Sequence, residues 1–227
     1  MATNMKWFTP LTGLAFAVLG VLSAFITGQP EGAKEPVGQI LGYYVDNKDA
    51  IQLGTFVGLA AVLLLVFFGA YLRQVLHAAG PDGEILSLVS FAGVLVVAVG
   101  FAIEGTITIA LTETADGIDP AAVQSLQALW DNAFVPLALG VLLFLWATGL
   151  AVVRTGVLPR WIGWLMIVLG VVSLTPLGWA AATAAAILVP VLSVLLAVRV
   201  RSARDATRGA GTAMTAAGLT TRPIEIK

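Results

Sequence analysis

Cysteine is missing altogether from the 227 residues of this chain, and His77 is the only histidine. Without cysteine the protein has no disulfide, thiol nucleophile, iron–sulfur cluster or thiolate metal site. A single histidine also excludes the paired-histidine zinc motif of metalloproteases and bis-histidine haem ligation. The sequence contains no phosphate-binding loop, nucleophile elbow or dinucleotide fingerprint. We therefore expect a protein that is not an enzyme and has no metal site and no cofactor.

Charge is also scarce. Charged residues make up 11% of the chain and hydrophobic residues 59%, whereas soluble domains have about 25% charged and 45–50% apolar residues. This composition leaves too little polar surface to cover a water-soluble globule, so it indicates an integral membrane protein. A basic face that could bind nucleic acid is missing, and we expect no nucleic-acid partner.

Long apolar runs take the place of the missing charges. A helix needs about 20 apolar residues to cross a hydrocarbon core of about 30 Å. The runs show no alternating strand pattern, so the predicted fold is an all-α, six-transmembrane-helix bundle over residues 1–200. Short amphipathic helices are predicted in the two long outer loops, at residues 37–45 and from residue 119. The six segments are 7–27, 52–72, 85–111, 133–153, 161–177 and 179–198.

Residues 201–227 differ from the rest of the chain. They are rich in Ala, Gly, Thr and Arg and show no hydrophobic period. Such a composition does not bury enough apolar surface to fold, so a disordered cytoplasmic tail is predicted.

The basic residues are distributed unevenly between the predicted loops. With both termini in the cytoplasm, ten of the twelve Lys and Arg residues lie on the cytoplasmic side, and only Lys34 and Lys48 lie outside. Excess Lys and Arg marks cytoplasmic loops. The sequence therefore predicts cytoplasmic N and C termini.

A short motif precedes the fifth segment. Residues 154–165 read RTGVLPRWIGWL, which resembles the LPRWLGWL signature at the fifth span of an uncharacterised six-pass bacterial, actinobacterial-type, integral membrane family, a domain of unknown function. Residues 43–47 and 67–72 are also similar to that family, and the likeness covers about residues 7–198 by pattern more than by identity. The resemblance implies six spans in a bacterial plasma membrane and brings no catalytic residues.

Glu104 is the one carboxylate within an apolar segment. Nineteen uncharged residues precede it after Glu84, about 28 Å of helix. Depending on where the span begins, Glu104 lies either at the outer edge of the hydrocarbon or several ångströms inside it. Asp131 and Asn132, with Thr106 and Thr108, are its expected neighbours. Glu104, Asp131 and Asn132 are therefore the candidate ligand or proton site, against the alternative of an ordinary interfacial residue.

Arg160, Arg199 and Arg201 lie at the predicted cytoplasmic boundary, where long basic side chains reach phosphates. We expect them to contact lipid headgroups. Membrane lipids are the expected partners, together with a membrane-protein partner or a second copy of the chain.

Glycine pairs seven residues apart lie on single helix faces and predict close helix contacts. In the last predicted span, a proline in the middle of the helix predicts a kink. The residues concerned are Gly13 and Gly20, Gly93 and Gly100, Gly163 and Gly170, and Pro190.

Two functional hypotheses follow. The first is a non-enzymatic binding or accessory component for a lipid-like molecule or for another membrane protein. The alternative is a small transporter or channel that uses Glu104 as its protonatable or cation-binding group.

Overall fold

The computed structural model describes residues 9–30, 32–173, 175 and 178–216. It is 87% helical, and the described residues include no strand, which confirms the all-α prediction. The elements are the 3-10 turn η1 (Thr9–Leu11) and the helices α1 (Thr12–Thr27), α2 (Val37–Asp46), α3 (Lys48–His77), α4 (Pro81–Thr114), α5 (Pro120–Asn132), α6 (Phe134–Thr155), α7 (Arg160–Val172) and α8 (Gly178–Ala216).

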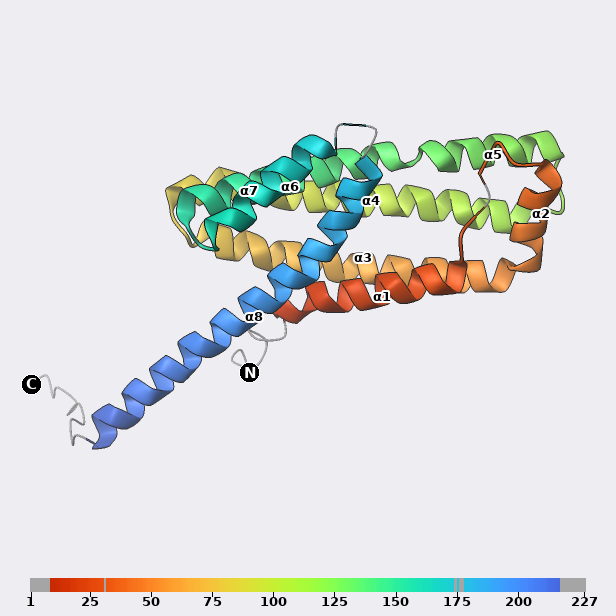
Figure 1. Cartoon of the computed structure of the whole chain (residues 1–227). Coiled ribbons are helices and arrows are strands. Elements are labelled where there is room, and N and C mark those ends of the chain that lie inside the picture. Colours follow the sequence, from red (N-terminus) through yellow and green to blue (C-terminus); the bar gives the residue numbers. More distant parts are fainter. Residues whose placement is uncertain (1–8, 31, 174, 176–177, 217–227) are drawn as a thin grey trace, which may run out of the picture.

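Five helices pack side by side in a row, and α8 packs across one face of it. Along the row α1 packs on α3, α3 on α4, α4 on α6 and α6 on α7. Helix α5 continues almost directly into α6, and α2 lies near α5 at one end of the row (Figure 1). Helix α8 crosses the face of the row obliquely and contacts α1, α6 and α7.

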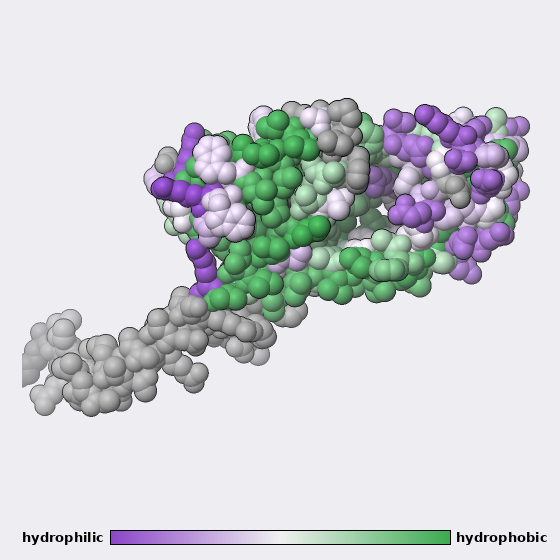
Figure 2. Space-filling view, viewed as in Figure 1, coloured by the Kyte–Doolittle hydropathy of each residue, from purple (hydrophilic) through white to green (hydrophobic). Residues whose placement is uncertain are grey.

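Four helices are long and apolar enough to cross a membrane, at Lys48–His77, Gly83–Thr114, Pro120–Thr155 and Ala180–Arg199. Helices α1 and α7 are apolar but shorter, with 16 and 13 residues. Large apolar side chains point outward from the bundle: Phe25 is 83% exposed, Leu63 64% and Phe56 60%. Figure 2 shows hydrophobic residues over the middle of the bundle and hydrophilic ones over the end formed by α2 and α5. The molecule therefore has the surface of a membrane protein.

The two short amphipathic helices are present as α2 and α5. Helix α5 begins as its sequence predicts, because the side chain of Asp119 accepts a hydrogen bond from the Ala121 backbone N–H at 2.8 Å and Pro120 occupies the first helical position. Residues 201–216 differ from the prediction, because α8 continues through them instead of ending in a disordered tail. This segment contains no proline and is rich in alanine, the best helix former, so an established helix propagates through it. Residues 217–227 lie outside the described residues.

Small residues bring the backbones of neighbouring helices together. A Cβ atom on Gly140 of α6 would lie 2.6 Å from the Val97 nitrogen of α4, and one on Gly93 would lie 2.5 Å from the Phe144 nitrogen. A Cβ atom on Gly163 of α7 would lie 2.8 Å from the Gly149 carbonyl oxygen of α6. These contacts set the spacing of α4, α6 and α7.

One of the predicted glycine contacts is wrong. On α1, Gly13 packs against Phe68, whose Cδ2 atom lies 2.8 Å from the position of a Cβ, but Gly20 has nothing within 4 Å. The two glycines share a helix face, yet the neighbouring helices fill the space at Gly13 only. The open space at Gly20 belongs to a cavity.

Candidate functional site

A cavity of about 420 Å³ lies between α1, α3 and α4, next to α2 and α5. Helix α8 contributes only Ala186 to its described lining, and α7 contributes none. Thirteen residues give α7 a length of about 20 Å, whereas the 34 residues of α4 extend for about 51 Å. Helix α7 and the start of α8 therefore reach only the middle of the row (Figure 1). Figure 2 shows the surface hollowed between α1 and the helices above it.

The cavity has an apolar end and a polar end. Helix α1 lines it along its whole depth with residues spaced three or four apart, so the cavity follows about 16 Å of this helix from Phe16 to Thr27. Helix α3 runs antiparallel to α1, and the Thr27 methyl lies 2.5 Å from the position of a Cβ on Gly54. This contact places Thr27 beside the start of α3. The apolar end is formed by Phe16, Gly20, Ala61, Val62, Phe101 and Ala186, and the polar end by Thr27, Tyr43, Tyr44, Thr55, Glu104, Thr108 and Trp130.

Glu104 lies at the polar end on the face of α4 that also carries Phe101, Gly105 and Thr108. The side chain is half-buried, and among the described residues its carboxylate takes part in no hydrogen bond or salt bridge. The described residues that line the cavity include no Lys, Arg or His. The carboxylate of Glu104 therefore faces a largely apolar space without a partner from these residues.

Trp130 connects α5 to the same end of α4. Its indole N–H donates to the Thr108 hydroxyl oxygen at 3.0 Å, and that hydroxyl donates to the Glu104 backbone carbonyl at 2.9 Å. The Tyr43 hydroxyl closes the opposite wall by donating to the Thr27 carbonyl at 2.7 Å. Aromatic side chains thus hold both walls of the polar end.

Helices α2 and α5, which we call the cap, are joined by a hydrogen-bond network above the polar end. The Tyr44 hydroxyl donates to Gln127 Oε1 at 2.7 Å, and Gln127 Nε2 donates to Asp131 Oδ1 at 3.0 Å. Asp131 Oδ2 also accepts from the Ala33 backbone N–H at 2.9 Å. Burial raises the pKa of the Tyr44 hydroxyl, and the nearby Tyr43 and Asp131 raise it further. The hydroxyl therefore stays protonated and remains a donor in this network.

The structure does not bring together the three residues predicted as a ligand or proton site. Glu104 lines the cavity, but Asp131 belongs to the cap network and Asn132 is exposed, with its Nδ2 donating to the Ala128 carbonyl at 2.7 Å. Of the two threonines expected near Glu104, Thr108 lines the cavity, whereas Thr106 is exposed.

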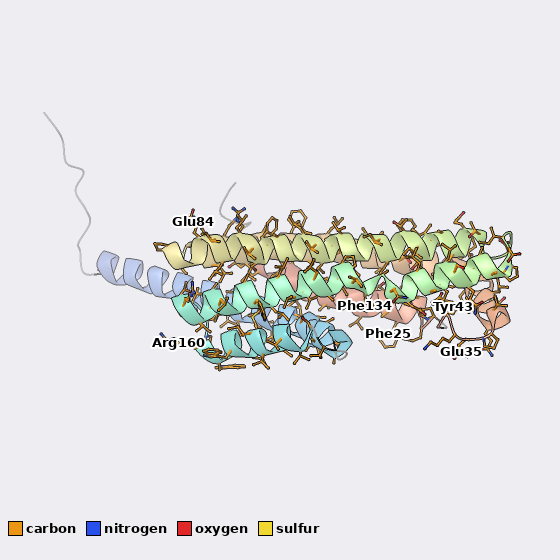
Figure 3. The ribbon with its side chains drawn as sticks, turned by 90° about the horizontal axis from the view of Figure 1, so that it is seen from above. Phe25, Glu35, Tyr43, Glu84, Phe134 and Arg160 are labelled. Atoms are coloured by element: carbon orange, nitrogen blue, oxygen red, sulfur yellow. The ribbon has the colours of Figure 1, made fainter. Side chains whose placement is uncertain are left out.

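The predicted headgroup arginines occupy the opposite end of the molecule. Figure 3 shows Glu84 and Arg160 at one end of the long axis and Glu35 at the other. Arg160 is the exposed first residue of α7. Arg199 Nη1 donates to the Val157 carbonyl, which ties α8 to the loop before α7. The side chain of Arg201 lies outside the described residues, and contact of the three arginines with lipid stays a prediction.

Sequence reasoning missed the cavity and the cap network. A signal for the cavity is present in α1, where small and polar residues recur every three or four positions at Gly20, Ser23 and Thr27. Such a stripe on an otherwise apolar helix marks a face turned away from lipid. The hydrogen bond from the Ser23 hydroxyl to the Gly54 carbonyl, 2.7 Å long, confirms that this face meets α3.

Comparison of the chain with protein-family models, with curated proteins and with solved structures gave no match.

Proposed function

We propose that the protein binds one lipid-like molecule in the cavity between α1, α3 and α4, and that it carries out no chemical reaction on it. The observation that supports this proposal is the two-ended cavity itself. Its apolar end matches a hydrocarbon chain and its polar end matches a headgroup. The volume of about 420 Å³ falls in the range of small-molecule sites, roughly 300–1,000 Å³, which are mostly apolar with a few polar groups.

The position of the polar end also supports a lipid-like occupant. Figure 3 shows Phe25 and Phe134 nearer the middle of the long axis, and Tyr43 and Glu35 further towards one end. Tyr43 thus lies on the hydrophilic side of the exposed Phe25 and Phe134, at the level where the headgroup of a lipid would reside. An occupant with its polar part beside Tyr43 would have its chain among the apolar side chains of the bundle.

The proposal includes a membrane topology. Six helices would lie in a bacterial plasma membrane, with both termini and Arg160 on the cytoplasmic side and the cap outside. The segregation of Lys and Arg supports this orientation. Helix α7, about 20 Å long, is shorter than the hydrocarbon core of about 30 Å, so the α7–α8 hairpin would end within the outer half of the membrane. Both termini would be cytoplasmic whether or not this hairpin crosses completely.

The absence of cysteine allows this topology to be tested directly. Asp116→Cys and His77→Cys place one thiol at each end of the long helices, and both positions are exposed. In intact cells a membrane-impermeant maleimide is expected to label position 116, and to label position 77 only after permeabilisation. Labelling of position 77 in intact cells would contradict the orientation.

Binding is tested by native mass spectrometry of the protein released from its own membrane. The wild type is expected to retain one lipid-like molecule. Gly20→Leu should lose it, because a side chain at Gly20 has free space and enters the cavity. Val18→Phe adds bulk on the same helix at a side chain that is 60% exposed, and it should retain the ligand.

Two results would overturn the proposal. A wild-type protein without any bound small molecule would remove its basis, and a bound protein in its place would favour the accessory role. Equal retention by Gly20→Leu and Val18→Phe would show that the ligand lies elsewhere.

A transporter or channel is the second candidate, because Glu104 lines the cavity. Ion and proton paths are usually lined by several polar groups along their length, whereas the polar groups here gather at one end. Proton or cation flux into liposomes that disappears in Glu104→Gln would favour this candidate over simple binding.

A further inference from the structure

We propose that the molecule held in the cavity carries a positively charged ammonium group, which pairs with Glu104 at the polar end, and an apolar chain that lies along α1 towards Phe16. This inference rests on the proposed function, because it specifies the chemistry of the ligand in the same cavity.

The Glu104 carboxylate has no hydrogen-bond or salt-bridge partner among the described residues. A carboxylate in an apolar cavity is costly unless it takes up a proton or meets a cation. The described lining residues offer no cation, and Lys34 and Lys48 are not among them. A cationic group on the ligand would supply the charge that the described lining lacks.

The C-terminal end of α1 borders the polar end of the cavity. The helix ends at Thr27, and residues 24 and 27–28 line the cavity. The last carbonyl groups of a helix carry a partial negative charge that favours cations. The end of α1 therefore adds to the negative potential of the Glu104 carboxylate.

Aromatic side chains line the polar end of the cavity. Tyr43, Tyr44 and Trp130 all line the cavity there, and the rings of Tyr43 and Tyr44 meet edge to face with centroids 5.0 Å apart. Aromatic faces attract ammonium groups, and several aromatic rings lining one site are an established way to bind ammonium ligands. An anionic headgroup would find no basic partner among the described lining residues.

The ammonium group could belong to a membrane phospholipid or to a free lipophilic amine. Titration of the purified full-length protein in neutral detergent distinguishes these two sources. Phosphatidylethanolamine and phosphatidylglycerol with identical acyl chains are compared by native mass spectrometry, and dodecylamine is added as a competitor. The wild type is expected to bind phosphatidylethanolamine at least about tenfold more tightly than phosphatidylglycerol, a difference in binding free energy of about 1.4 kcal/mol. Displacement by dodecylamine would assign recognition to the amine alone, and resistance to it would assign recognition to the phospholipid headgroup.

Glu104→Gln, which mimics the protonated carboxyl, should reduce the preference to less than about threefold and leave binding of phosphatidylglycerol unchanged. Glu113→Gln is the matched control, because Glu113 lies on the same helix, accepts a hydrogen bond from Gln52 Nε2 at 2.6 Å and does not line the cavity. It should keep the full preference. Equal affinity of the wild type for both lipids, or a preference that survives Glu104→Gln, would overturn the inference but leave lipid binding intact. A wild-type protein that binds neither lipid and no dodecylamine would contradict both this inference and the proposed function.

Discussion

Gly140→Leu is expected to abolish accumulation of folded protein. A Cβ at this position would lie 2.6 Å from the Val97 nitrogen and 2.8 Å from the Gly93 carbonyl oxygen. Both atoms belong to the backbone of α4, so no side chain can rotate away and the two helices must separate. Overpacking of this kind usually costs about 1–3 kcal/mol and sometimes more, and a backbone clash belongs to the upper end.

The separation would extend beyond the glycine. The hydroxyls of Ser90 on α4 and Thr148 on α6 lie 2.7 Å apart in the buried contact between the same helices. Moving the helices apart would break this hydrogen bond and leave two buried polar groups without a partner. The combined loss approaches the whole stability of many proteins of this size.

Size-exclusion profiles and thermal unfolding in detergent measure the effect. Gly20→Ala is the control, because its added methyl group has open space, and it should accumulate as the wild type does. A monodisperse Gly140→Leu protein with an unchanged melting temperature would show that α4 and α6 are not in close contact.

Gln127→Leu is expected to loosen the contact between α2 and α5 within the cap. Gln127 is fully buried, and its side chain connects the Tyr44 hydroxyl to Asp131. Its loss leaves the buried Tyr44 hydroxyl without an acceptor, which costs about 1–3 kcal/mol. Hydrogen exchange of the backbone amides in α2 and α5 should then accelerate by about tenfold or more, since 1.4 kcal/mol corresponds to a factor of ten.

The double variant Tyr44→Phe, Gln127→Leu provides the control. Removing both polar partners leaves no orphaned hydroxyl, so protection of α2 and α5 should recover by at least about half of the lost free energy. Strictly additive effects of the two substitutions would show that the hydroxyl and the amide do not interact. Exchange in α3 should be unchanged in all variants.

Features that depend on one segment at a time could be predicted from the sequence. The long apolar runs predicted α3 and α4, and Asp119 followed by Pro120 predicted the start of α5. The helical identity of these segments follows from composition and local hydrogen bonding, because a backbone in an apolar medium must satisfy its own polar groups. The resemblance to a six-pass family stays a prediction.

Features that depend on how far one helix extends beside another could not be predicted. The seven-residue spacing of Gly13 and Gly20 places both on one face, but only the position of α8 and the short α7 decide that a cavity lies at Gly20. Thr108 lines the cavity with Glu104 as expected, but the expected neighbours Asp131 and Asn132 do not, for the same reason. Asp131 and Asn132 are close to its level along the bundle, yet the rotation of α5 turns Trp130 to the cavity and Asp131 to the loop at Ala33.

The shortness of α7 also makes the cross-section of the molecule uneven. In the proposed topology α3, α4 and the α5–α6 pair run from the cytoplasmic end to the cap, while α7 and the part of α8 that packs on it reach only from the cytoplasmic side to the turn between them. A helix is about 10–12 Å wide, so each of the two takes up roughly 100 Å² of membrane area. In that topology the protein would displace more lipid from the cytoplasmic leaflet than from the outer leaflet. Where membrane curvature stretches the cytoplasmic leaflet, the larger area of the protein in that leaflet would relieve the stress. The protein would therefore concentrate at membrane with this curvature.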